Sequence, residues 1–197
     1  MRAVIFDVGR VLVHWDPAAT LAGLAEISQA GPADLQSLWG QSSHDLGTGA
    51  LSAQAFHSHL IDYAGTDENW GRFYTAFCRG LRRDDAALRY TAELAGRGIP
   101  LGIISNTNAI HVQWLHAHLP ELAHFRSVVW SSDVGLLKPD RAIYDLAAGS
   151  LGADPARTLF VDDLEENAAG AEAAGLAGWV HRDWDETINA IEAWLRR

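Results

Sequence analysis

The stretch that decides the fold is AVIFDVG, residues 3–9, near the start of the chain. Four apolar residues, two of them β-branched, end at Asp7, and Gly9 follows two positions later. A short continuous apolar run of this kind is typical of a strand that is buried on both faces. Gly9 suits the tight loop that must come next. We therefore predict a buried strand over residues 3–6 that presents Asp7 at its carboxyl end.

From residue 84 onward, helical patterns alternate with short apolar runs. The expected strands are residues 101–104, 127–130, 158–161 and 178–180. The expected helices are residues 84–97, 109–118, 141–150, 165–174 and 184–195. Strands that alternate with helices predict an α/β fold, with a parallel sheet covered by helices on both faces.

Residues 17–83 interrupt this α/β pattern with helical periodicity alone. Pro17 suits a first helical turn, and we find no convincing strand in this stretch. We therefore predict two parts: a discontinuous α/β core of residues 1–16 and 84–197, and a helical insert of residues 17–83.

The bulk composition excludes several classes of protein. The 197 residues carry a formal net charge of −10 and include no run of Lys and Arg, so nucleic acid is a poor candidate partner. The apolar stretch at the start is far too short for a signal peptide, and no apolar run is long enough to cross a membrane. The single cysteine excludes an internal disulfide and fits a reducing compartment. We expect a cytoplasmic protein with no membrane partner.

Reactive side chains follow three of the predicted strands. Asp7 follows the first, Ser105 and Asn106 follow the second, and Asp162 and Asp163 follow the fourth. Ligands of open parallel sheets bind at the carboxyl ends of the strands, so these groups are expected to share one site. Lys138, in the loop after the third strand, is expected to reach the same edge.

Phosphoryl transfer needs this combination of groups. A carboxylate can attack phosphorus, while clustered carboxylates call for a hard cation such as Mg²⁺ with oxygen ligands. A lysine, a hydroxyl and backbone N–H groups at a helix N-terminus can bind the phosphate oxygens. Each group alone has an ordinary structural explanation, such as a helix cap or a surface lysine. Their order and placement together indicate a phosphate site.

The motifs that carry these residues resemble those of the haloacid dehalogenase (HAD) superfamily over nearly the whole chain. The similar segments are IFDVGRVL (residues 5–12), ISNT (104–107), LKP (137–139) and FVDD (160–163) with Asn167. Within the superfamily, the chain is most similar to small phosphatases that include glucose-1-phosphate phosphatases. The resemblance implies a Rossmann-like core with a helical cap over the active site.

The resemblance also implies a role for each matching residue. Asp7 would be the nucleophile and a magnesium ligand, together with the Gly9 carbonyl and Asp163, and Asp162 would lie close behind and could reach the metal through a water. Lys138 would neutralise the phosphate and orient Asp7. Ser105 and Asn106 would hold the phosphate, and Asn167 would brace the metal loop. The expected activity is hydrolysis of a small phosphorylated metabolite, for which a sugar phosphate is one candidate.

Two positions depart from the family pattern. Many HAD phosphatases carry an acid/base Asp where this chain has Gly9, although similar phosphatases also have Gly there. A good leaving group, a metal-bound water or a cap residue could substitute, and His14 and Asp16 are the nearest candidates; the alternative is that they only shape the loop. Arg10 stands where Asn or Gly is commoner, and could approach the phosphate or point to solvent.

Other features have structural explanations that we favour. The spacing of His57 and His59 and that of His111, His116 and His118 do not match a helical zinc site, so surface or packing roles are expected. Cys78 is expected to be a buried thiol. Trp15 and Trp39 are candidates for lining a pocket under the cap.

Two other functions remain as alternatives to a phosphatase. A dehalogenase on the same fold would attack carbon with Asp7 and need no metal, which leaves the Asp162-Asp163 pair unexplained. A non-catalytic binding protein is suggested by Gly9 and Arg10, but the presence of Asp7, Lys138 and Asp163 argues against it.

Overall fold

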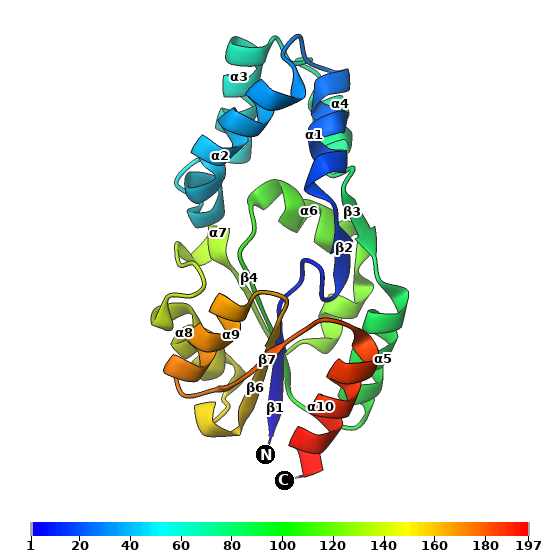
Figure 1. Cartoon of the computed structure of the whole chain (residues 1–197), viewed down its shortest axis with the longest axis vertical. Helices are drawn as coiled ribbons and strands as arrows, with labels where there is room; N and C mark the ends of the chain where they lie inside the picture. Colours follow the sequence, from blue (N-terminus) through cyan, green and yellow to red (C-terminus); the bar gives the residue numbers. More distant parts are fainter. Residues whose placement is uncertain (1, 197) are drawn as a thin grey trace.

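The computed structural model describes residues 2–196, and a five-stranded parallel sheet forms its centre (Figure 1). β1 (Ala3–Phe6) lies in the middle, between β4 (Leu101–Ser105) and β6 (Thr158–Asp162). β5 (Ser127–Trp130) and β7 (Ala177–Val180) form the two edges. Every pairing in this sheet is parallel, as the alternation of strands and helices predicted.

The side chains of β1 alternate between two apolar layers. Val4 and Phe6 belong to one buried cluster, and Ala3 and Ile5 to the other. This alternation follows from the pleat of a strand, which points successive side chains to opposite faces. The sheet is therefore buried on both sides, which explains why its central strand is apolar throughout.

Helices cover the two faces of the sheet. α8 (Arg141–Leu151) and α9 (Glu165–Ala173) pack on the face that Ile5 occupies. The opposite face is covered by α5 (Asp85–Gly96), α6 (Ala109–His118) and α10 (Trp184–Arg196). Figure 1 shows these two groups on either side of the strands. In the described residues, no helix has both the length and the apolar character needed to cross a bilayer.

Three short elements join the strands and helices of this part of the chain. They are η1 (Pro120–His124), α7 (Ser131–Val134) and η2 (Pro155–Arg157). We did not predict α7, a single turn that separates β5 from the loop carrying Lys138.

Four helices form a separate group beyond the carboxyl ends of the strands (Figure 1). They are α1 (Pro17–Glu26), α2 (Pro32–Thr48), α3 (Ala53–Ala64) and α4 (Trp70–Phe77). α1 packs against α2 and α4, and the end of α2 reaches α7. At that contact a Cβ on Gly49 would lie 2.1 Å from the Ser132 carbonyl oxygen, so only glycine allows this close approach.

An antiparallel ribbon carries the chain into and out of the four helices. β2 (Val13–Trp15) pairs with β3 (Leu81–Arg83), and Trp15 lies opposite Leu81. The expectation that residues 17–83 contain no strand was therefore wrong at β3. Each strand has only three residues and depends on a partner distant in sequence, so no local pattern marks either one.

Candidate active site

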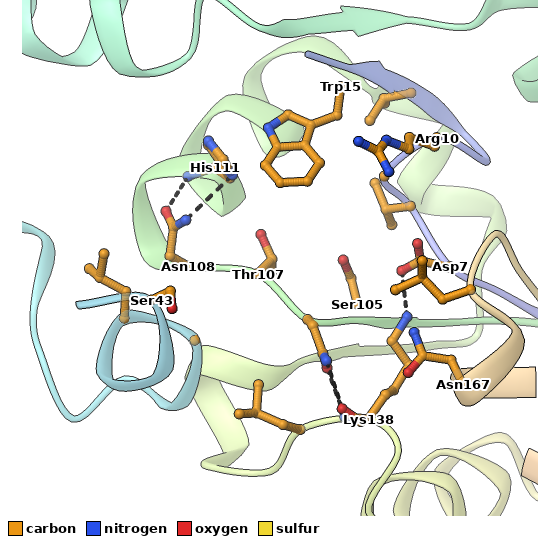
Figure 2. A pocket seen from close by; sticks show the side chains of 18 of the residues that line it. Asp7, Arg10, Trp15, Ser43, Ser105, Thr107, Asn108, His111, Lys138 and Asn167 are labelled. Carbon is orange, nitrogen blue, oxygen red and sulfur yellow. Dashed lines mark hydrogen bonds and ion pairs between the residues drawn. The ribbon is translucent and has the colours of Figure 1, made fainter. Parts of the chain in front are cut away.

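Side chains from four segments meet where the parallel strands end (Figure 2). Asp7 follows β1, Ser105 is the last residue of β4, and Asp162 is the last residue of β6. Lys138 comes from the loop after α7, and Asp163 follows Asp162. The structure thus brings together the groups that the sequence placed at separate strand ends, as the topology of an open parallel sheet requires.

Lys138 is the centre of the hydrogen-bond network. Its buried Nζ donates to Asp7 Oδ1 at 2.7 Å, to Asp162 Oδ2 at 2.6 Å and to the Ile104 carbonyl at 3.3 Å. An ammonium group has three donors, so all three are used. The Asn106 side chain fixes the lysine's backbone, because its Nδ2 donates to Lys138 O (2.9 Å) and its Oδ1 accepts from Lys138 N (2.8 Å).

The two adjacent acids Asp162 and Asp163 differ in environment. Asp162 is completely buried, and its Oδ1 accepts from Leu164 N at 2.9 Å and from Asn167 Nδ2 at 3.0 Å. Asn167 is held in turn by the Tyr144 hydroxyl, which donates to its carbonyl at 2.8 Å. Asp163 is only half-buried and lines the cavity. Asp162 therefore supports the site from behind, and Asp163 faces it.

The carboxylates are crowded. One oxygen atom from each of Asp7, Asp162 and Asp163 lies within 4.8 Å of the others. Burial, opposed by Lys138 and assisted by Asp162, raises the pKa of Asp7 to about 6. Burial and then Asp162 raise the pKa of Asp163, against the opposing effect of Arg10. The three acids thus face two cations, Lys138 and Arg10. The remaining negative charge and the hard oxygen donors suit a divalent cation such as Mg²⁺.

Arg10 faces the cavity. Its Nη1 lies 3.6 Å from Asp163 Oδ2, and its guanidinium lies over the Trp15 ring at 5.5 Å from the centroid. Arg10 adopts a φ of 60°, a region that Asn and Gly enter more readily than Arg. The side chain is half-exposed, and it lies beside Asp163 at the rim of the cavity.

A cavity of about 480 Å³ extends from these acids toward the four helices. Residues that line it include Trp39 and Leu46 of α2, Trp15 of β2 and Leu115 of α6. Trp15 and Trp39 thus lie in the cavity wall. The volume is in the range that encloses a small organic molecule.

The family model for haloacid dehalogenase-like hydrolases matches residues 1–175. The chain belongs to this family. The predicted resemblance to HAD proteins is therefore confirmed, and the chain is an enzyme of the hydrolase class.

Several relatives of this HAD-like hydrolase are phosphatases. The sesquiterpene phosphatase astK of Aspergillus oryzae is 27% identical over 180 residues, which cover 90% of this chain and 88% of astK. A phosphoglycolate phosphatase of Yersinia pseudotuberculosis is 30% identical over 189 residues, which cover 89% of this chain and 78% of that phosphatase. A HAD family enzyme of Bacteroides thetaiotaomicron, solved with magnesium and inorganic phosphate, has the same fold: its TM-score is 0.83 at 19% identity, over 95% of this chain and 98% of that one.

Gly9 leaves space in this HAD-like hydrolase where many members of the family carry an acid. Gly9 lines the cavity, and a Cβ added there would meet no heavy atom within 4 Å. The absence of an Asp side chain therefore does not result from crowding.

The structure gives no support to an acid/base role for His14 or Asp16, because neither lines the cavity. His14 Nε2 lies 3.5 Å from Asp84 Oδ2. Asp16 caps α1, since its Oδ1 accepts from the backbone N–H groups of Ala18 and Ala19. These contacts match the alternative considered from the sequence, in which the two residues shape the connection to the helices.

Sequence reasoning missed one residue that lines this HAD-like site and one that supports a lining residue. His111, expected to have a surface or packing role, is buried in the cavity wall, and burial lowers its pKa to about 4. Ser131 was not considered; its hydroxyl accepts from Thr107 N at 2.9 Å and donates to Thr107 O at 3.0 Å. His111 sits in the first turn of α6, the helix that follows β4 at the carboxyl edge of the sheet, and that position is the signal that could have identified it.

The other discounted residues have structural roles. His57 is buried and contacts the Asp67 carbonyl through Nε2 at 2.9 Å, whereas His59 is exposed. His118 Nδ1 lies 2.8 Å from the Trp114 carbonyl. Cys78 is buried, which raises the pKa of its thiol to about 12. Within the described residues, the cluster of potential metal ligands found is the one at Asp7.

Proposed function

We propose that this HAD-like hydrolase is a magnesium-dependent phosphatase that hydrolyses a small phosphorylated metabolite through an aspartyl-phosphate on Asp7. One observation carries the proposal. At the floor of the cavity, the carboxylates of Asp7, Asp162 and Asp163 lie close together, and buried Lys138 pairs with the first two, which leaves an excess of negative charge. A carboxylate nucleophile, a cation site and a fixed ammonium group are what phosphoryl transfer requires.

The metal ligands would be Asp7, the Gly9 carbonyl and Asp163. Asp162 would act behind them, because both of its oxygens already accept hydrogen bonds from Lys138, Leu164 and Asn167. Bound Mg²⁺ would neutralise the phosphate charge and align the phosphorus with the nucleophile. The Bacteroides thetaiotaomicron enzyme of the same fold, solved with magnesium and phosphate, supports this choice of ion.

The phosphate would be held by Ser105 and Asn106, and the positive charge of Lys138 beside Asp7 would help to neutralise it. Because the Asn106 side chain is already bonded to the Lys138 backbone, Asn106 would contribute its backbone N–H. Asn108 caps α6, because its side chain accepts from Ile110 N and His111 N. This helix begins at the edge of the sheet that carries Asp7, and the partial positive charge of its N-terminus favours a phosphate there.

The reaction has two steps. An oxygen of Asp7 attacks phosphorus, the bond from phosphorus to the ester oxygen breaks, and the alcohol leaves with a proton taken from water. A second water then attacks the phosphorus of the aspartyl-phosphate, releasing inorganic phosphate and the Asp7 carboxylate. Lys138 holds Asp7 Oδ1 at 2.7 Å throughout and so keeps the nucleophile oriented.

We also propose that residues 17–83 act as a helical cap over the core of residues 1–16 and 84–197. The position of α1–α4 beyond the strand ends and the cavity-lining residues of α2 support this division (Figure 1). A cap of this kind excludes water and sets which alcohol can fit beside the phosphate.

The test is hydrolysis of p-nitrophenyl phosphate, with Mg²⁺ or with chelator, by wild type, Asp7→Asn and the exposed control Asp145→Asn. We expect release that depends on magnesium, that is lost in Asp7→Asn and that persists in Asp145→Asn. Equal release by Asp7→Asn would overturn the mechanism. Chloride release from a 2-haloacid without magnesium would identify a dehalogenase instead.

A further inference from the structure

Five apolar side chains from four different elements line the cavity, and we call them the apolar wall: Trp15, Trp39, Leu46, Leu81 and Leu115. The ring centroids of Trp15 and Trp39 lie 6.5 Å apart, and Trp39 is stacked on Phe77 at 5.3 Å. Figure 2 shows Trp15 on the other side of the cavity from Lys138. A phosphate held at Asp7 would therefore direct its alcohol group toward this wall.

The nitrogen atoms of Trp15 and of the neighbouring His111 add little polarity to the cavity. Trp15 Nε1 and His111 Nε2 are buried, with almost no surface that a molecule in the cavity could reach. His111 Nδ1 faces Asn108 Nδ2 at 3.4 Å, and Asn108 Oδ1 accepts from the backbone N–H groups of Ile110 and His111. The rings of Trp15 and His111 therefore present mainly carbon atoms to a ligand.

The charges of the cavity disfavour a substrate with a second acidic group. The Lys and Arg side chains of the described chain that line the cavity are Lys138 and Arg10. All three donors of Lys138 are already used inside the protein, and Arg10 lies beside Asp163 at the rim. Asp7 and Asp163 would repel a further negative charge. His44 also lines the cavity, but it is exposed, and an ion pair in such a position contributes little.

The apolar wall selects in the same direction as these charges. A carboxylate or hydroxyl group that leaves water for this wall would lose hydrogen bonds that the wall does not replace. A hydrocarbon group loses none, and burial of its apolar surface is favourable. The cavity of about 480 Å³ has room for such a group.

We propose that the apolar wall binds the alcohol part of the substrate, and that this alcohol is mainly hydrocarbon, without a second charged group. This inference rests on the phosphatase function proposed above and names its substrate class. Trp39 is the specificity-determining residue, because it is the largest apolar side chain that α1–α4 contribute to the cavity and Phe77 supports its ring from behind.

The test compares phenyl phosphate with its derivatives that carry an isopentyl, a 2-carboxyethyl or a 2,3-dihydroxypropyl group in the para position. The three substituents are similar in size and join the ring through a methylene group, so the leaving groups are closely matched. For wild type with Mg²⁺, we expect kcat/KM for the isopentyl ester to exceed that for phenyl phosphate by about tenfold or more. The other two esters should not exceed phenyl phosphate. A carboxyethyl or dihydroxypropyl ester that matches the isopentyl ester would overturn the inference, and loss of a carboxyethyl advantage in His44→Gln would identify His44 as the partner of the acid.

Trp39→Ala tests the wall itself, and Trp70→Ala is the matched control. We expect Trp39→Ala to lower the ratio of kcat/KM for the isopentyl ester to that for phenyl phosphate by about fivefold or more. Trp70 lies on α4 and packs on Phe73, with ring centroids 5.3 Å apart, but it does not line the cavity. Trp70→Ala should therefore leave the ratio as in wild type. Partial unfolding cancels, because each ratio compares two substrates on the same variant. Equal falls of the ratio in the two variants would overturn the inference.

A binding measurement separates failure of this inference from failure of the proposed function. Calorimetric titration with 4-isopentylphenol, 3-(4-hydroxyphenyl)propionate and phenol needs no turnover. Tightest binding of 4-isopentylphenol, weakened in Trp39→Ala and not in Trp70→Ala, would support the apolar wall even if no ester were hydrolysed. Magnesium-dependent hydrolysis with equal kcat/KM for all four esters would keep the phosphatase and reject the apolar wall.

Discussion

Lys138 Nζ lies 2.7 Å from Asp7 Oδ1, although 131 residues separate them in the sequence. The same Nζ reaches Asp162 Oδ2 at 2.6 Å, so one ammonium group bridges two carboxylates from the central strands. The lysine side chain is 2% exposed, and water can therefore replace little of this interaction. The pair joins stability to function, because the bond that satisfies a buried charge also holds the proposed nucleophile.

Replacing Lys138 by Met should be strongly destabilising. The variant would leave Asp7 and Asp162 buried without their cation, and breaking a buried pair from one side typically costs about 3–5 kcal/mol. Urea unfolding in chelator at pH 7.5 measures the change. The control Arg141→Met removes an exposed ion pair with Asp145 and should cost less than about 0.5 kcal/mol. Similar costs for the two variants would contradict the bridging role of Lys138.

Asp7→Asn should be more stable than wild type when no metal is bound. The folded pKa of Asp7 is raised from 3.8 to about 6, so the folded state binds more protons than the unfolded state between these values. Stability is therefore lost as pH rises through this window, and the full cost is present at pH 7.5. One pKa unit corresponds to about 1.36 kcal/mol, so removing the charge should raise the free energy of unfolding by up to about 3 kcal/mol.

Urea unfolding with chelator and with Mg²⁺ checks this prediction. Magnesium should stabilise wild type more than Asp7→Asn, because the variant loses a proposed ligand. The control Asp145→Asn, at an exposed carboxylate, should follow wild type in both conditions. A less stable Asp7→Asn in chelator would show that the Lys138 contact outweighs the crowding of the acids.

Gly9→Asp should speed hydrolysis of esters with poor leaving groups. The position has room for a side chain, and an acid there could protonate the departing alcohol. We expect kcat for an alkyl phosphate such as glycerol phosphate to rise by about tenfold or more, within the range of general acid catalysis. The increase for p-nitrophenyl phosphate should be smaller, since nitrophenolate leaves without a proton. Gly9→Asn, of equal size, is the control and should show no such difference.

Arg10→Asn should bind Mg²⁺ more tightly than wild type. The Arg10 guanidinium lies 3.6 Å from Asp163 and repels a cation at the same carboxylate. Because this contact is half-exposed, we expect a lowering of the Kd for Mg²⁺ of only about two- to fivefold. Asn also tolerates the φ of 60° better than Arg. Calorimetric titration measures the Kd, with Arg182→Asn as control for an exposed arginine paired to Glu165. Weaker binding in Arg10→Asn would indicate that Arg10 supports the metal site.

The sheet and the ends of its strands could be predicted because their signals are local. Apolar runs with β-branched residues mark each central strand, and polar groups at their carboxyl ends must meet in a parallel sheet. Asp7, Ser105 and Asp162 follow from this rule alone.

The remaining features depend on contacts between distant residues. Nothing local distinguishes Asp162 from Asp163. The family resemblance assigned them different roles, and the physical reason is that Lys138 and Asn167 occupy the oxygens of Asp162. The pairing of β2 with β3 and the position of the Trp39 ring depend in the same way on how the four helices pack over the core. A histidine such as His111 gives no periodic signal that separates a cavity wall from an ordinary helix face.

His111 makes the stability of the protein dependent on pH. Its folded pKa of about 4 is below the unfolded value of 6.5, because burial disfavours the charged ring. Between these values the unfolded state binds more protons, so stability is fully present above pH 6.5 and is lost as pH falls toward 4. One pKa unit corresponds to about 1.36 kcal/mol, so His111 alone should lower the free energy of unfolding by about 2 kcal/mol between pH 7.5 and pH 5. Urea unfolding at the two pH values should show a smaller loss in His111→Phe than in wild type, whereas His59→Phe, at an exposed position, should match wild type. Equal losses in wild type and His111→Phe would mean that the buried ring finds a counter-charge on protonation.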